Sequence, residues 1–222
     1  MRELHAGLWH WQAPHPDWAP GARWPQEVSS YAVDDGARLL LFDPLAVPHE
    51  LLDLAADRET VVVLTAPWHE RDSQTLVERL GVPVFLPPPD TADDLVRKYG
   101  VTLEQAAGGS PDVAWLLAGN GGEAHLYAAD ERLPIGIDAF PGRDHNDLVL
   151  WVESVGAVIG GDTLVDFGRG LELNDWLRGG VTREQVVERL LPLLERPVEF
   201  VLPAHGAPTD RVALERALLT AD

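Results

Sequence analysis

Short apolar runs recur along the chain, and segments containing Gly, Pro and Asp separate them. Runs of this kind between turn signals predict β-strands. Asp35-Gly36 lies between two of them and supplies the positive φ that a tight hairpin turn requires. We expect strands at 31–34, 37–42, 60–65, 82–86, 133–140, 147–153, 156–161 and 199–202, an irregular segment or a short strand at 9–25, and two short strands within 116–127 around a turn with Gly119, Gly121 and Gly122.

Other segments have the helical period of about 3.6 residues. Leu76 and Val77 share one face of such a segment, and Gly81 ends it. Thr182 is a suitable N-cap for another. The strand, helix and strand between 60 and 86 form a βαβ unit, and the whole order predicts an α/β fold of two mixed sheets with helices outside. We expect helices at 49–56, 72–80, 90–99, 182–194 and 209–219.

Length and hydropathy bound the organisation of the chain. The sequence has 222 residues, of which 45% are hydrophobic, and it shows no linker, repeat or low-complexity tract. A chain of this length can bury a sizeable core, so we expect a single domain over 1–222. No stretch reaches the roughly 18 consecutive apolar residues that a membrane helix needs, and residues 1–13 lack the apolar centre of a signal peptide. We therefore expect a cytoplasmic protein with no membrane partner.

The sequence lacks cysteine and is rich in acidic residues. Without cysteine, any metal must be held by His, Asp or Glu, which suits zinc, iron or manganese. The formal net charge of −19 argues against a nucleic-acid partner. There is no Gly-x-Ser-x-Gly elbow and no Gly-x-x-x-x-Gly-Lys loop, which disfavours a serine hydrolase and a P-loop nucleotide-binding protein.

Four of the predicted strands stop at small groups of polar residues. Loops at strand ends, held by a rigid sheet, are the usual place for a binding site, so we expect these groups to form one. The groups are Asp43-Pro44, the loop 66–72 (APWHERD), Asp162-Thr163-Leu164 and Pro203-Ala204-His205-Gly206.

In their order and spacing these motifs resemble the metallo-β-lactamase superfamily, from Tyr31 onward. The resemblance implies an α/β fold, a four-layer αββα sandwich of the metallo-β-lactamase type with the site at one edge. Most members of the superfamily are hydrolases that use one or two metal ions, commonly zinc or iron, and some are oxidoreductases, lyase-like or inactive. Among the expected ligands, only Asp162 and His205 match the superfamily's positions residue by residue.

The main metal-binding motif of the superfamily, His-x-His-x-Asp-His, is rewritten in this chain. Counted from Thr65, Ala66 and Trp68 replace the first two histidines, Glu70 replaces the aspartate and Arg71 replaces the final histidine. The motif that the resemblance implies is therefore degenerate.

Two more candidate residues lie beside the expected ligand positions. The next ligand of the superfamily follows a Pro-Gly pair, but here that pair is followed by Arg143, and His145 comes two residues later. His69 occupies a position to which the motif assigns no ligand. The loop 68–72 resembles that of a divergent, poorly characterised subgroup with a His-His-x-Arg-Asp-like sequence.

The first hypothesis for function is a metal-dependent hydrolase with an altered ligand set. One zinc, iron or manganese ion would lower the pKa of a coordinated water to about 7 and so supply a nucleophile. Arg71 or Arg143 would hold an anionic group of a small-molecule substrate, and Asp162 and His205 would complete the catalytic set. The metal ligands would be His69, His145, Asp162 and His205.

The alternative is a metal-free protein of the same fold that binds a ligand or a partner. Arg71 and Arg143 would replace the metal, because a guanidinium pairs well with a carboxylate, and their partners would be Asp162, Asp72 or Asp43. His69 would then be a polar residue of its loop, and His145 would be solvated. The sequence leaves both hypotheses open.

Four of the eight tryptophans lie in the first part of the chain. Such a group can line an apolar ligand pocket, form a homodimer interface or pack on the edge of a sheet. The sequence does not separate these roles for Trp9, Trp11, Trp18 and Trp24.

Overall fold

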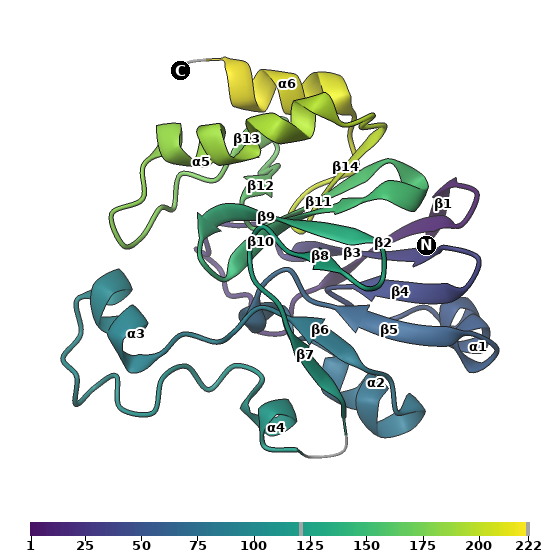
Figure 1. Cartoon of the computed structure of the whole chain (residues 1–222), viewed down its shortest axis with the longest axis horizontal. Coiled ribbons are helices and arrows are strands. Elements are labelled where there is room, and N and C mark those ends of the chain that lie inside the picture. The colour runs from purple at the N-terminus through teal and green to yellow at the C-terminus, as the bar shows by residue number, and fades with distance from the viewer. Residues whose placement is uncertain (120–121, 221–222) are drawn as a thin grey trace.

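Two mixed β-sheets lie face to face, and helices cover their outer faces (Figure 1). The computed structural model describes residues 1–119 and 122–220. In these residues the first sheet has seven strands in chain order, antiparallel from β1 to β4 and parallel from β4 to β7. Its strands are β1 (Arg2–His5), β2 (Leu8–Pro14), β3 (Glu27–Asp34), β4 (Arg38–Phe42), β5 (Glu59–Val63), β6 (Val84–Leu86) and β7 (Ala124–Leu126).

The second sheet has the strand order β14-β11-β10-β9-β8, in which β11 and β14 are parallel and the other pairs are antiparallel. A separate pair, β12 (Leu164–Val165) and β13 (Glu172–Leu173), follows β11. The strands of the second sheet are β8 (Arg132–Leu133), β9 (Ile137–Asp144), β10 (Asp147–Val152), β11 (Ala157–Gly161) and β14 (Phe200–Pro203).

Helices α1 (His49–Ala56), α2 (Ser73–Leu80) and α4 (Ala114–Leu117) pack on the first sheet, and α5 (Arg183–Leu190) and α6 (Arg211–Leu219) pack on the second (Figure 1). Helix α3 (Ala92–Tyr99) stands at one side of the molecule (Figure 1). This arrangement confirms the predicted four-layer αββα sandwich. Among the described residues, no helix is long and apolar enough to cross a membrane.

Residues that alternate along the inner strands supply two different cores. On β4, Leu40 and Phe42 face the core between the sheets, whereas Leu39 and Leu41 face α1 and α2. Because successive side chains of a strand point to opposite faces, a strand buried on both sides is apolar at every position. The same reasoning accounts for the continuous apolar run of β10.

The predicted hairpin at Asp35-Gly36 is confirmed, and so is the βαβ order of β5, α2 and β6. Two predicted elements are shorter than expected. Helix α5 ends at Leu190 and continues as a 3₁₀ turn over Leu191–Glu195, because Pro192 has no backbone N–H to donate. The predicted strand at 133–140 is interrupted by Gly136, which has a positive φ, so that β8 and β9 form a hairpin.

One further prediction is confirmed in one of its two alternatives, and another was wrong in part. In the segment 9–25, expected to be irregular or a short strand, residues 9–14 belong to the strand β2, and a preceding strand, β1, pairs with β2. Among the described residues of the segment 116–127, only β7 is a strand, and the first residues belong to helix α4, which packs Leu116 on the first sheet. Gly121 lies outside the described residues.

Candidate functional site

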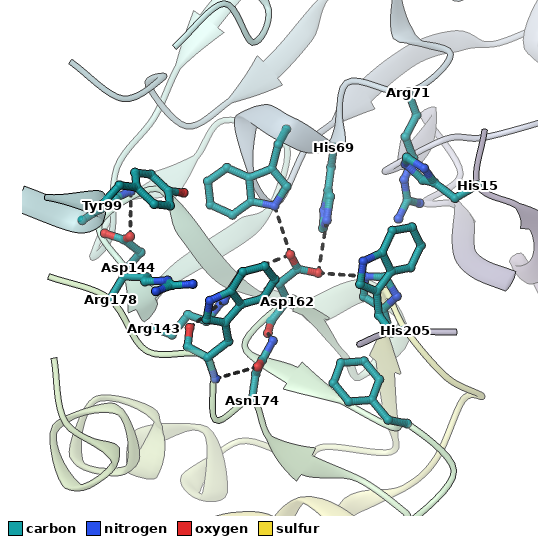
Figure 2. Close-up of a pocket in the computed structure, with 15 residues that line it drawn as sticks. His15, His69, Arg71, Tyr99, Arg143, Asp144, Asp162, Asn174, Arg178 and His205 are labelled. Atoms are coloured by element: carbon teal, nitrogen blue, oxygen red, sulfur yellow. Dashed lines mark hydrogen bonds and ion pairs between the residues drawn. The ribbon is translucent and has the colours of Figure 1, made fainter. Parts of the chain in front are cut away.

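Loops that follow three strands meet at one end of the two sheets and line a cavity of about 280 Å³ (Figure 2). His69 lies in the 3₁₀ turn Pro67–His69 after β5, Asp162 follows β11, and His205 follows β14. We call these three residues the histidine cluster. The polar residues that follow these strands therefore lie together at one site, as the sequence predicted.

Asp162 is the centre of the histidine cluster. Its Oδ1 lies 3.2 Å from Nε2 of His69 and 3.2 Å from Nε2 of His205. Its Oδ2 accepts hydrogen bonds from the indole Nε1 of Trp68 at 3.0 Å and from Nη2 of Arg143 at 3.1 Å. Oδ1 is buried and accepts no hydrogen bond of good geometry from the described residues, although two imidazole nitrogens face it.

Asp43 fixes the orientation of the His69 ring. Its Oδ2 lies 3.1 Å from Nδ1 of His69 and also accepts a hydrogen bond from the hydroxyl of Thr65 at 2.6 Å. The backbone N–H of Thr65 donates to the other carboxylate oxygen at 2.8 Å. With Nδ1 bound to Asp43, Nε2 of His69 is the atom that faces Asp162 and the cavity.

The electrostatics of the histidine cluster follow from its burial and its close charges. Burial opposes the charged form of His69, but the carboxylates of Asp43 and Asp162 outweigh it and raise the pKa of His69 to about 9. Burial also opposes the charge of Asp162, yet His69 and His205 hold its pKa well below the usual range. In the absence of other ions, these groups are a buried carboxylate and a protonated imidazole.

The two predicted arginines line the cavity but have different partners. Arg71 donates to the backbone carbonyl oxygens of Ser29 at 2.9 Å and of Asp43 at 2.6 Å. The sequence predicted carboxylate partners for Arg71, and the structure gives it backbone carbonyl groups instead. Arg143 pairs with Asp162 at 3.1 Å and also with Asp147. The pair with Asp162 is the one that the metal-free hypothesis predicted. Burial lifts the pKa of Asp147 to about 6, although Arg143 pulls the other way.

His145 lies apart from the histidine cluster. Its Nδ1 is 3.1 Å from Asp144, and its Nε2 is 3.7 Å from Asp94 and 3.9 Å from Asp90. Its side chain is 38% exposed. The structure therefore brings together three of the four predicted ligands, and His145 belongs to a different group of side chains.

Beside His145 is a buried lysine at the wall of the cavity. The side chain of Lys98 is 2% exposed, and its ammonium lies 2.6 Å from Asp90, 2.6 Å from Asp144 and 3.0 Å from the side-chain oxygen of Asn146. We call these four residues the lysine cluster. They join helix α3 to the turn between β9 and β10, which carries Arg143 and Asp147 at its two ends.

The histidine cluster has the spacing and the chemistry of a metal site. One ligand atom from each of His69, Asp162 and His205 lies within 4.8 Å of the other two. Metal–ligand bonds of about 2.0–2.1 Å in a tetrahedron place ligand atoms roughly 3.3 Å apart, close to the two separations of 3.2 Å. A carboxylate on the far side of a ligating imidazole, as Asp43 is here, fixes the tautomer that binds.

Sequence reasoning missed several residues of the site. Trp68 was noted only as a lost ligand, but its indole holds Asp162. Asp147 and Lys98 gave no signal, since their roles depend on pairing across distant strands and helices. Thr65 carried a usable signal, because a polar residue ends an otherwise apolar strand beside Asp43.

Neither a protein-family model nor a curated protein matches this sequence. Solved structures match in fold. The archaeal metallo-β-lactamase superfamily protein ST1585 from Sulfolobus tokodaii is 16% identical, with a TM-score of 0.63 over 97% of this chain and 87% of that one. A metallo-β-lactamase from Erythrobacter litoralis is 13% identical, with a TM-score of 0.62 over 98% of this chain and 93% of that one.

A third structure is that of TTHA1623 in a di-iron-bound form, which is 25% identical, with a TM-score of 0.57 over 90% of this chain and 98% of that one. These likenesses confirm the predicted resemblance to the metallo-β-lactamase superfamily. The chain has the metallo-β-lactamase fold, and its sequence is 13–25% identical to these three solved structures.

Proposed function

We propose that this protein is a hydrolase of small organic molecules that binds one metal ion through His69, Asp162 and His205. The observation that carries the proposal is the convergence of one carboxylate oxygen of Asp162 with one imidazole nitrogen each of His69 and His205, because these ligand atoms all lie within 4.8 Å of one another. An ion at this point would be coordinated by all three atoms and would take the place of the proton that His69 shares with Asp162. The fold supports the proposal, since TTHA1623 is solved with iron bound.

The neighbouring side chains of the chain prepare these three ligands. Asp43 holds Nδ1 of His69, so that Nε2 is available. Trp68 and Arg143 occupy Oδ2 of Asp162 and leave Oδ1 free. When bound there, a zinc, iron or manganese ion supplies a Lewis acid and activates water at neutral pH.

One ion, and not two, is what the rewritten motif supports. Ala66 has no side-chain donor, and the indole of Trp68 is committed to Asp162. These residues stand where the superfamily's first two histidines would be, so a second ion lacks those ligands. Arg71, in the place of the last histidine, adds a fixed positive charge that further disfavours a second cation.

The walls of the cavity fit a small substrate with apolar parts. Trp24, Trp68, Phe167 and Trp176 line it, and aromatic walls exclude water and strengthen the electrostatic interactions inside. Esters and thioesters of this size are the substrates that we propose to screen, because their carbonyl group is the group that a Lewis acid polarises.

Calorimetric titration with zinc tests the metal site directly. The wild-type chain is expected to bind about one equivalent, as a single three-ligand site requires, and His205→Ala is expected to lose that binding. His145→Ala is the matched control, because this histidine lies outside the histidine cluster, and it should bind zinc as the wild type does. Equal binding by the wild type and His205→Ala would contradict the proposed ligand set.

A metal-free binding protein is the second candidate, and one observation favours it. Arg143 and a protonated His69 already face the carboxylate of Asp162, so they can neutralise it without an ion. On this view no ion binds, and Arg143→Ala destabilises the fold by about 3–5 kcal/mol, because Asp147 would be left buried without its partner. An unchanged melting temperature for Arg143→Ala would count against it.

A further inference from the structure

The cavity is rich in positive charge although the protein as a whole is acidic. Arg71, Lys98, Arg143 and Arg178 line it, whereas the formal net charge of the chain is −19. A cationic cleft in an acidic protein focuses the local field and attracts anions. The question is which of these cations is available to a ligand.

Three of the four cations are committed to partners within the protein. Arg71 donates to backbone carbonyl groups, Lys98 is enclosed by the lysine cluster, and Arg143 pairs with Asp147 and Asp162. Arg178 differs from Lys98 and Arg143 because it has no ion pair with any carboxylate of residues 1–119 and 122–220, and it differs from Arg71 because its side chain is exposed and is not bonded to backbone carbonyl groups of those residues. It is the cation of the cavity that can pair with a bound anion.

Arg178 is nevertheless held in place. Its guanidinium lies over the ring of Trp176, 5.0 Å from the centroid, and over the ring of Tyr99, 5.8 Å from the centroid. Such cation–π contacts orient a guanidinium and leave its N–H groups free in the plane. The position of Arg178 is therefore set by stacking, while its hydrogen-bonding edge has no acidic partner.

The loop that carries Arg178 is tied to the histidine cluster. The side-chain amide of Asn174 donates to the backbone oxygen of Asp162 at 2.8 Å, and the backbone oxygen of Trp176 accepts from Nη1 of Arg143 at 2.9 Å. Figure 2 shows Arg178 and Tyr99 at one side of the cavity, His205 at the other, and Asp162 between them. An anion bound by Arg178 would thus lie at a fixed place relative to Asp162.

We propose that Arg178 binds the carboxylate of the substrate, and that the substrate is an organic acid with a flat apolar body. One free guanidinium matches a single negative charge, and its planar fork fits a carboxylate. The cavity also has the aromatic walls of Trp24, Trp68 and Phe167, which suit an apolar body, and two of these rings lie against His205. The statement that this acid is a substrate rests on the proposed hydrolase function. The binding of a carboxylate by Arg178 does not depend on that function.

Calorimetry with a matched pair of probes tests this assignment. Phenylacetate and phenylacetamide differ in charge and share the same apolar body. The wild-type chain is expected to bind the acid about tenfold more tightly than the amide, as a charged hydrogen-bonded contact of about 1.5–3 kcal/mol at a partly exposed site allows. Arg178→Gln should remove this preference, and Arg178→Lys should restore part of it, because lysine keeps the charge and loses the planar fork.

The control variant is Arg58→Gln, which removes another exposed arginine. Arg58 pairs with Asp34 outside the cavity, so this change should leave both affinities unaltered. The assignment is overturned if the acid binds no better than the amide, or if Arg178→Gln keeps the preference. It is also overturned if the preference disappears in EDTA, since a bound ion would then be holding the carboxylate.

The two proposals can fail separately. Failure of the zinc titration would remove the hydrolase proposal and leave the preference for the acid, measured in EDTA, intact. Failure of the probe titration would remove the role of Arg178 and leave the metal stoichiometry intact.

Discussion

The histidine cluster and the lysine cluster are both groups of buried charges at the cavity, but their polar atoms are satisfied differently. Lys98 places its ammonium against three oxygen acceptors, which matches its three N–H donors. Asp162, by contrast, has one buried oxygen that accepts no hydrogen bond of good geometry from the described residues. This difference supports the proposal that the histidine cluster binds an ion, whereas the lysine cluster has its ammonium satisfied within the protein.

The largest expected effect is that of Asp162→Ala on metal content. Removal of the central ligand should abolish binding of the ion, and hydrolysis of any substrate found should be lost with it. Metal analysis of the purified variant checks this, with Asp53→Ala, an exposed carboxylate of α1, as the control. Metal retained at the wild-type level in Asp162→Ala would mean that other residues hold it.

The next largest effect is that of Lys98→Met on stability. The substitution leaves Asp90 and Asp144 without their cation, and breaking a buried ion pair in this way costs about 3–5 kcal/mol. Denaturant unfolding measures the loss. The zinc stoichiometry of the folded variant should be unchanged, because Lys98 contacts none of the three ligands. A variant as stable as the wild type would show that the lysine cluster does not hold α3 in place.

Asp43→Asn should have a smaller effect, on metal affinity. The change weakens the partner of Nδ1 in His69 without removing a ligand, and changes at such positions typically lower metal affinity about 10- to 100-fold. Competition with a chelator of known affinity measures this factor. An unaltered affinity would show that the ring of His69 is held by Thr65 and packing alone.

The smallest effect concerns acid stability. Burial of Asp144 opposes its charge, but His145 and Lys98 outweigh it and lower its pKa to about 2. A depressed folded-state pKa gives stability that is complete above the unfolded pKa near 3.8 and is lost as the pH falls through about 2. The contribution is roughly 2 kcal/mol. Unfolding between pH 5 and pH 2 should show this loss, and Lys98→Met should show less of it.

The fold could largely be predicted from the sequence, because it depends on local patterns. The Asp35-Gly36 turn, the alternating and continuous apolar strands, and the motifs at Asp162 and His205 each act over a few residues. The failures lie where the structure depends on distant pairing. The strand β2 is stabilised by β3 and by burial of Trp11, and its composition alone did not distinguish it from an irregular segment.

The site was predictable only in part, for a related reason. The residues of the histidine cluster follow apolar strands, and this position singled them out. The position of His145 outside the histidine cluster could not be predicted, because the turn that carries it adjoins a register shift between Asp147 and Leu148 in the β9–β10 pair, which no local pattern indicates. Arg178 carried no motif at all, and its position depends on the rings of Tyr99 and Trp176.

Elemental analysis of the full chain, purified without a tag or a chelator, tests the central claim most directly. The account predicts about one equivalent of zinc, iron or manganese per chain, as purified or after incubation with that ion. A chain that holds none of the three ions after incubation with each would contradict the proposed metal site, and would leave Arg143 and the protonated His69 as the groups that neutralise Asp162.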